Sequence, residues 1–281
     1  MKRFTELETI RIEPRGRVAL LTLNRPERLN AISARMMDEV EAVLDAAAQD
    51  EGTGAVVVCG AGRAFCSGYD LKDDAAKPAA DTEAWRARLA RDLDFLLRFW
   101  NLPKPTIAAV HGHCLAGGCE LAMSCDITIA EEGCLFGEPE LKFGSVIVNM
   151  MMPWLVGPKL AKEVLLSGDD RLSAERAERI GLVNRVVAKG THVDEALALA
   201  GRIAALDTDA VVRTKAAINR GFAIMGLHEA LRAGLDAAAE IESMETPSRA
   251  EFKRRVCAHG LRAALDWRDS RLAGQSGPDR E

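Results

Sequence analysis

Two glutamates and a glycine pair lie close together in one stretch, and their types and spacing suit proton chemistry. Residues 107–140 read IAAVHGHCLAGGCELAMSCDITIAEEGCLFGEPE. A glycine pair at a strand-to-helix turn, here Gly117-Gly118, leaves backbone N–H groups facing a ligand oxygen. Glu120 follows Gly117 by three residues, so one helical turn brings its carboxylate to the same face. Donors beside Glu120 and Glu140 suit adding or removing a proton next to a carbonyl, which predicts an enzyme.

Short apolar runs alternate with helix-like segments and must position these residues. The runs that we interpret as strands cover residues 17–23, 54–62, 106–112 and 126–130. Apolar periodicity predicts helices over 34–49, capped by Ser33, and over 83–101. This alternation indicates an α/β architecture. A stretch rich in Ala, Asp, Lys and Pro at 72–82 has no periodicity and is expected to be a mobile loop.

From about residue 193 the pattern changes to helices alone. Helical periodicity without intervening strands covers segments 193–205, 209–222, 227–242 and 247–266. We therefore divide the chain into an α/β core that holds the site, 1–192, and a helical region, 193–281. Because the apolar stripes of these helices exceed what one small bundle needs, we expect them to pack on the core and on neighbouring subunits.

The composition is that of a soluble globular protein. Apolar residues make up 48% and charged residues 28% of the 281, which is ordinary for such a protein. The net charge of −5 gives no overall basic field that would favour nucleic acid or an anionic membrane. No apolar run reaches the roughly 18 residues that span a bilayer, and the charged N-terminus does not resemble a signal peptide. We expect a cytoplasmic protein.

Several polar and sulfur-containing residues are expected to be structural. The seven cysteines are odd in number and form no CxxC, so we interpret them as reduced, buried side chains and expect no metal site. His111 and His113 are interpreted as core or loop histidines, and the methionines at 150–152 as packing or the wall of an apolar pocket. Asp126 would cap a backbone or form an ion pair.

The chemistry-bearing residues also have structural alternatives when each is taken alone. The glycines would allow close helix packing, and AGRAFCSGYDL (61–71) would be a tight turn after a strand rather than a ligand site. Glu120 would form a structural salt bridge within its apolar helix, because an unpaired buried carboxylate is costly. Glu138 and Glu140, near a loop, would be solvated carboxylates. Only the combination of these features points to a site.

That combination resembles the enoyl-CoA hydratase/isomerase (crotonase) family. The resemblance covers five ordered segments: LTLNRPERLNAIS (21–33), GRAFCSGYDL (62–71), KPTIAAVHGHCLAGGCELAMSCDITIA (104–130), FGEPELKFG (136–144) and SAERAERIGLVNRVV (173–187). It implies a spiral core of ββα repeats and a C-terminal helical region used for trimerisation. The expected assembly is a homotrimer or a dimer of trimers.

The resemblance implies an oxyanion hole and an acid–base pair. The backbone N–H groups of Tyr69 and Gly117 would bind the thioester oxygen of an acyl-CoA as enolate charge develops. Glu120 would activate a water that adds to C3, and Glu140 would supply a proton to C2. No cofactor is implied beyond the coenzyme A of the substrate. The predicted activity is that of a 2-enoyl-CoA hydratase in fatty acid metabolism.

Coenzyme A is expected along residues 25–29 and 61–65. The residues predicted to bind it or the acyl group are Arg28, Ala61, Arg63, Ala64, Phe65, Ser67, Gly68, Asp70, Leu71, Gly118, Val146 and Lys253. Arg28, with Lys253 or Arg268, is expected near the phosphates.

One segment departs from the hydratase pattern. After Gly144, where hydratases have a small-residue turn, this chain has SVIVNMMMPWLVG (145–157), which predicts an altered acyl pocket. Tyr69 is also larger than usual for its position. The alternatives are a Δ3-Δ2 enoyl-CoA isomerase that uses one glutamate, an acyl-CoA hydrolase or decarboxylase, and a non-catalytic acyl-CoA- or RNA-binding protein. The acidic charge disfavours RNA, and the retained glutamates disfavour an idle site.

Overall fold

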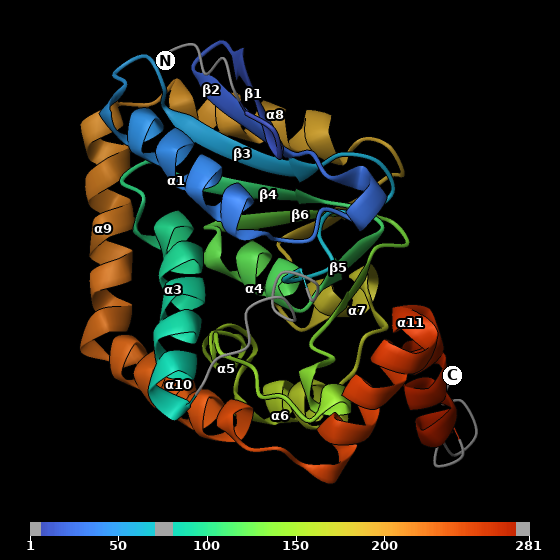
Figure 1. Cartoon of the computed structure of the whole chain (residues 1–281). Helices are drawn as coiled ribbons and strands as arrows, with labels where there is room; N and C mark the ends of the chain where they lie inside the picture. Colours follow the sequence, from blue (N-terminus) through green and yellow to red (C-terminus); the bar gives the residue numbers. More distant parts are fainter. Residues whose placement is uncertain (1–6, 71–80, 274–281) are drawn as a thin grey trace.

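A six-stranded sheet forms the centre of the computed structural model, which describes residues 7–70 and 81–273 (Figure 1). The sheet has the order β1-β2-β3-β4-β6-β9. Its strands are β1 (Ile10–Arg15), β2 (Val18–Leu23), β3 (Ala55–Gly60), β4 (Thr106–Val110), β6 (Ile127–Glu131) and β9 (Arg185–Val187). Only the β1–β2 pair is antiparallel. The parallel strands are covered by helices on both faces, as such sheets require.

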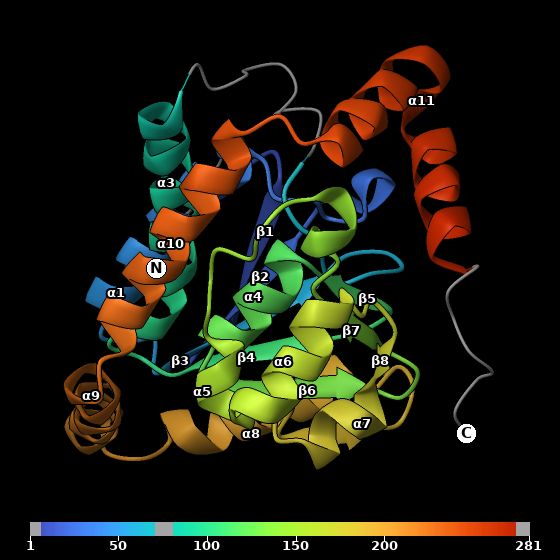
Figure 2. The same ribbon diagram turned by 90° about the horizontal axis from the view of Figure 1, so that it is seen from below.

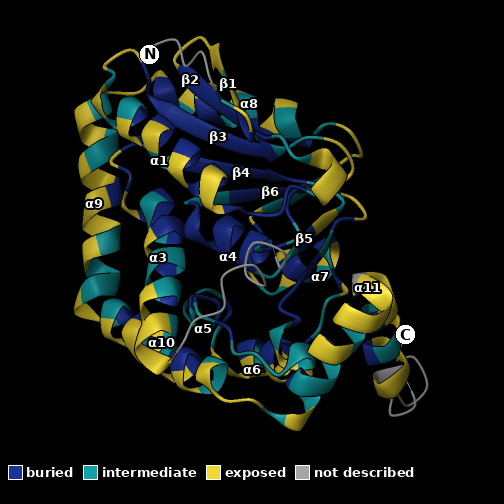
Figure 3. Ribbon diagram, viewed as in Figure 1, coloured by how far each residue is buried: buried dark blue, intermediate teal, exposed yellow. Residues whose placement is uncertain are grey.

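Successive side chains of a strand point to opposite faces of the sheet, and each face packs into its own hydrophobic core. In β2, Leu21 and Leu23 pack with α1 (Ala34–Gln49) and α3 (Thr82–Asn101) on one face. Val18 and Leu20 pack on the other face with the alanines of α8 (His192–Ala204). The eight-residue α4 (Gly117–Ser124) lies beneath the sheet beside α3, and all of its residues are buried (Figure 3).

A second, three-stranded sheet places the two glutamate-bearing segments side by side. It consists of β5 (His113–Leu115), β7 (Leu135–Gly137) and β8 (Leu172–Ser173). β5 runs parallel to β7 and leads into α4, whereas β7 leads into the 3-10 helix η2 (Glu140–Phe143). Because parallel strands end at the same edge of a sheet, Glu120 and Glu140 leave that edge together. The remaining short elements are η1 (Pro26–Arg28), α5 (Met152–Val156), α6 (Pro158–Ser167) and α7 (Ala174–Arg179), of which α7 contacts β7 and β8.

The C-terminal region is helical, as predicted. It contains α9 (Thr208–Ile224), α10 (Leu227–Ser243) and α11 (Pro247–Ala273), the last kinked at Gly260. Figure 2 shows α10 packed along α3, and α11 contacts η2. Among the described residues, no helix is both long and apolar enough to cross a membrane. The expected strands and helices are confirmed, with ends that agree to within a few residues except that α11 continues to Ala273. The strands β1, β5, β7, β8 and β9 were not predicted, and the loop expected at 72–82 falls almost entirely outside the described residues.

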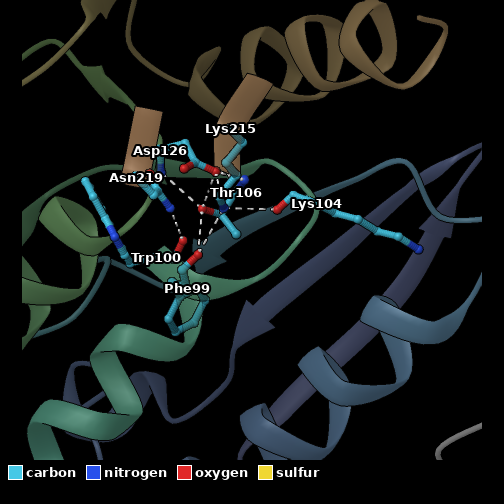
Figure 4. A network of polar contacts seen from close by, with 7 residues as sticks. All are labelled: Phe99, Trp100, Lys104, Thr106, Asp126, Lys215 and Asn219. Atoms are coloured by element: carbon cyan, nitrogen blue, oxygen red, sulfur yellow. Dashed lines mark hydrogen bonds and ion pairs between the residues drawn. The ribbon is translucent and has the colours of Figure 1, made fainter. Parts of the chain in front are cut away.

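A buried lysine attaches α9 to the sheet (Figure 4). Lys215 Nζ donates to Asp126 Oδ2 at 2.7 Å and to the carbonyl oxygens of Phe99 at 3.3 Å and Lys104 at 3.2 Å. The same Asp126 oxygen accepts the Thr106 N–H at 2.7 Å. Burial raises the pKa of Asp126, and the neighbouring ammonium acts in the opposite direction. The network joins α9, the end of α3 and the start of β4, which confirms the expected ion pair of Asp126.

Replacing Lys215 by methionine is expected to destabilise the protein by about 3–5 kcal/mol, because Asp126 loses its buried cationic partner. Urea unfolding followed by circular dichroism measures the change. The matched control is Arg262→Met, which removes an ion pair with Asp266 whose arginine side chain is 90% exposed. That change should cost less than about 1 kcal/mol. Equal unfolding midpoints for the two variants would contradict the structural role of Lys215.

Candidate active site

The segment that carries Tyr69 is attached to the strand that leads into α4. Cys66 N donates to the His113 carbonyl at 3.1 Å, and Leu115 N donates back to the Cys66 carbonyl at 3.0 Å. Phe65 N donates to the His111 carbonyl at 2.9 Å in the same way. This short parallel pairing fixes residues 65–70 against the turn that begins α4.

Tyr69 and Gly117 consequently lie in contact. A Cβ added to Gly117 would lie 2.6 Å from Tyr69 Cε2, and one added to Gly68 would lie 2.7 Å from Ala116 Cβ. Ala116 itself has a φ of 53°, a left-handed conformation that residues with a side chain rarely adopt. The Tyr69 hydroxyl donates to the Asp92 carbonyl of α3 at 3.1 Å, which holds the ring in place.

The start of α4 is suited to hold negative charge. As the first residue of the helix, Gly117 has an N–H with no acceptor inside the helix, and the positive end of the helix dipole lies there. Gly118 lies still closer to the segment that carries Cys66 and Tyr69, since a Cβ added to Gly118 would lie 2.4 Å from the Cys66 carbonyl oxygen. The structure thus brings together Tyr69, Gly117 and Gly118, the residues predicted to form the oxyanion hole and its surroundings.

Glu120 projects from the first turn of this helix and is only 3% exposed. Burial, and next the nearby Glu140, raise the pKa of its carboxyl group to about 8. Backbone hydrogen bonds from Asn149 and Val148 act in the opposite direction. The distance from Asn149 N to Glu120 Oε1 is 2.9 Å. The salt bridge considered from the sequence is therefore wrong, because the partners of this carboxylate are backbone N–H groups.

Asn149 is a site residue that the sequence did not reveal. It is 1% exposed, and its side-chain Nδ2 donates to Ser124 Oγ at 3.0 Å. Ser124 Oγ in turn donates to the Glu120 carbonyl at 2.8 Å. The bulky segment 145–157, expected only to reshape the acyl pocket, therefore also positions Glu120. Its one available signal was an asparagine within an apolar run.

Glu140 begins η2, and its Oε2 atom is buried without a hydrogen-bond partner among the described residues. Burial raises the pKa of this carboxyl group to about 7, while its own backbone N–H and the Glu138 carboxyl lower it. Glu120 and the Oε2 atom of Glu140 are therefore removed from water, and the two carboxyls lie near enough to influence each other's charge. A pKa close to neutral suits a group that must both take up and release protons.

Glu138 is not the solvated carboxylate that its position near a loop suggested. It is fully buried, since its N–H donates to the Asp169 carbonyl at 3.0 Å and β7 is pressed against that backbone. A Cβ on Gly137 would lie 2.2 Å from the Asp169 carbonyl oxygen. Burial, and next the Glu140 carboxyl, raise the pKa of Glu138 well above its ordinary value.

The segment predicted to bind coenzyme A is fixed by an asparagine. Asn30, in a left-handed conformation with φ 55°, donates from Nδ2 to the carbonyls of Ala61 and Ala64, both at 2.8 Å. Its Oδ1 accepts the Arg25 N–H at 2.9 Å. The two stretches predicted to line the coenzyme, 25–29 and 61–65, are therefore joined. The sequence showed both stretches but not the residue that connects them.

The remaining predicted binding residues differ in exposure. Arg28 and Arg63 are exposed, Ser67 is half-buried, and Ala64 and Phe65 are buried. Asp70 forms an ion pair with Arg25 at 2.8 Å.

The predicted binding residues farther along the chain lie on other elements. Val146 is half-buried in the segment that leads to Asn149, and Lys253 is exposed on α11. Leu71 lies outside the described residues. Arg268 is 8% exposed and stacks over Phe143 of η2 at 4.5 Å.

Comparison with known proteins identifies the family to which the chain belongs. The family model for enoyl-CoA hydratase/isomerase matches residues 13–258. The chain belongs to this family. A solved enoyl-CoA hydratase/isomerase from Xanthobacter autotrophicus Py2 has 50% identity and a TM-score of 0.92, and the match covers 95% of this chain and 99% of that one. The crotonase fold expected from the sequence is thereby confirmed.

Curated members of the enoyl-CoA hydratase/isomerase family share much of this sequence. A protein of Rhizobium meliloti (strain 1021) named "Probable enoyl-CoA hydratase" is 42% identical over 229 residues, which is 80% of this chain and 86% of that protein. The "Short-chain-enoyl-CoA hydratase" of Clostridium acetobutylicum is 36% identical over 220 residues, 77% of this chain and 83% of that protein.

The substitution Gly118→Ala is expected to lower stability by about 1–3 kcal/mol, because its methyl group would push α4 away from the Cys66 carbonyl. Because the same shift moves Gly117 from Tyr69, catalysis should fall as well, by about 10²-fold. Gly201→Ala is the matched control, since its Cβ would meet nothing within 4 Å on α8. It should stabilise the protein by up to about 1 kcal/mol. Similar effects of the two alanines, measured by urea unfolding, would contradict the close contact at Gly118.

Stability is expected to fall as the pH rises from about 4.5 to about 8. With pKa values of about 8 and about 7, Glu120 and Glu140 keep protons in the folded protein that the unfolded chain releases near 4.5. The double variant Glu120→Gln/Glu140→Gln should show a shallower decline in unfolding free energy. Glu132→Gln, at an exposed carboxylate, should keep the wild-type slope. If unfolding free energy changed with pH in the same way in the double variant and the wild type, the raised pKa values of Glu120 and Glu140 would be contradicted.

Proposed function

We propose that the protein is an enoyl-CoA hydratase that adds water across the 2,3 double bond of a 2-enoyl-CoA thioester. The observation that carries this proposal is the pair of neighbouring carboxyls, Glu120 and Glu140, of which Glu120 projects from the helix that begins at the contact between Tyr69 and Gly117. An enzyme that only stabilises an enolate needs hydrogen-bond donors at the carbonyl oxygen and no pair of carboxyls. Two adjacent carboxyls with pKa values near neutrality also provide for the proton taken from water and the proton given to carbon.

The donors would act on the thioester carbonyl. With that oxygen placed between the backbone N–H groups of Tyr69 and Gly117, the negative charge that forms as water attacks C3 is stabilised by fixed dipoles. The positive end of the α4 dipole acts in the same direction. Because α4 is entirely buried, the low dielectric strengthens these interactions without reorganisation of solvent.

The carboxyls would divide the proton transfers between them. Glu120, held by the Asn149 N–H, accepts a proton from water while the water oxygen bonds to C3. Glu140 donates a proton to C2, and the proton gained by Glu120 later restores Glu140. A single proton shared by the pair at neutral pH supplies one acid and one base at once. Assembly as a homotrimer or a dimer of trimers and a cytoplasmic location stay predictions.

A Δ3-Δ2 enoyl-CoA isomerase is the second candidate. It is favoured by the apolar segment that ends at Asn149, because Ile147 is buried and Val146 and Val148 are half-buried next to the residue that binds Glu120. Such a wall reduces access of water to the acyl group. One glutamate would then move a proton between C2 and C4, and the other would have no acid–base role.

Glu120→Gln and Glu140→Gln are each expected to lower the rate of crotonyl-CoA hydration by about 10²–10⁴-fold, because each removes one proton transfer. The loss of the conjugated enoyl-thioester absorbance measures the rate. Glu132→Gln, which changes an exposed carboxylate to the same amide, should leave the rate unchanged.

A 3-enoyl-CoA assayed in parallel distinguishes the two candidates. Conversion to the 2-enoyl product that depends on only one of the two glutamates, without hydration, would establish the isomerase. Hydration at the wild-type rate in both glutamine variants would exclude the proposed mechanism.

A further inference from the structure

A third carboxyl lies beside the two that the proposed mechanism uses. Glu138 is fully buried, and neither of its carboxylate oxygens accepts a hydrogen bond from an N–H or hydroxyl group of the described residues. Its position is not the result of a mobile loop, since Gly137 and the Glu138 N–H are held against the Asp169–Asp170 backbone. The energy lost by burying an unpartnered carboxyl calls for an explanation in the site itself.

The surroundings of Glu138 disfavour a charged form. Burial has the largest effect, and the carboxyls of Glu140 and Glu120 and the thiol of Cys119 also disfavour a negative charge. In the described part of the chain, Glu138 forms no ion pair, and no group of three metal-binding side chains has the geometry of a metal site. A carboxylate under these conditions takes up a proton, and a neutral carboxyl has one O–H to donate.

The acceptor that matches this donor is Glu140. Its Oε2 atom is also buried without a partner, and the Glu138 carboxyl favours the charged form of Glu140. Once Glu140 has given its proton to carbon, its charged carboxylate accepts a hydrogen bond from a neutral carboxyl more strongly than an uncharged group would. We propose that Glu138 keeps a proton and donates it in a hydrogen bond to Glu140, so that the two side chains work as one carboxylic acid–carboxylate pair.

This makes Glu138 a positioning residue, a role that rests on the proposed function of Glu140. The hydrogen bond occupies one Glu140 oxygen and leaves the other for C2. It also favours the charged form that Glu140 reaches after it has given its proton to carbon. No atom is gained or lost at Glu138 during a turnover, because its own proton stays in the pair.

Two substitutions separate the hydrogen bond from packing. Glu138→Gln keeps the shape and offers an amide N–H to Glu140, so kcat should stay within about 5-fold of wild type. Glu138→Met keeps the volume but has no donor, and kcat should fall about 10- to 100-fold with KM nearly unchanged. In Glu138→Met, the limb of the kcat–pH profile that depends on Glu140 should move to higher pH. Equal kcat values and pH profiles for the two variants would overturn the proposal.

Infrared spectroscopy tests the proton without any assay of activity. At about pH 7, the difference spectrum of wild type minus Glu138→Gln should contain the C=O stretching band of a protonated carboxyl. The exposed control Glu132→Gln should remove only carboxylate bands. A carboxylate band in place of the acid band at Glu138 would overturn the proposal. Because the protein carries no substrate in this measurement, its result stands even if the protein proves not to hydrate enoyl-CoA.

Discussion

The close approach of two backbone segments is the constraint on which the site depends. Residues 66–69 can lie against the turn into α4 only because Gly68, Gly117 and Gly118 have no side chains. A Cβ atom added to any of the three would lie only 2.4 to 2.7 Å from an atom of the facing segment. The same approach forces Ala116 into a left-handed conformation, a strain that the hydrogen bonds of β5 to Cys66 and of Ala116 to Gly137 must offset. Without this contact, the segments that carry Tyr69 and Gly117 would not lie side by side.

Close packing at this point also decides the chemistry of the carboxyls. With α4 wholly buried, Glu120 exchanges water for two backbone N–H groups, and its pKa moves toward neutrality. Burial raises the pKa values of these carboxyls, and Glu140 raises those of Glu120 and Glu138 further, which costs stability in the folded protein. Contacts elsewhere in the fold must offset this cost, among them the Lys215 network that attaches α9 to the sheet.

The sequence predicted what local pattern controls and missed what distant contacts decide. Periodicity and the Ser33 cap gave the helix 34–49, and the glycine pair marked the turn into α4. β1 was missed because Arg11, Glu13 and Arg15 obscure an edge strand whose buried contacts are few. Glu138 was misjudged because its burial arises from Asp169, thirty-one residues later, and Asn149 reaches Glu120 across twenty-nine residues. No local pattern records such pairings.

The position of Glu140 depends on the far end of the chain. η2 is a single 3-10 turn, too short to be stable alone, and few backbone bonds fix it. Phe143 packs edge-to-face on Phe252 at 5.1 Å and beneath Arg268 at 4.5 Å, both on α11. Lys142 is held by Asp170 at 2.8 Å, beside the backbone that buries Glu138. The C-terminal helix therefore stabilises the segment that carries Glu140, so the helical region contributes to the geometry of the candidate site as well as to the surface of the protein.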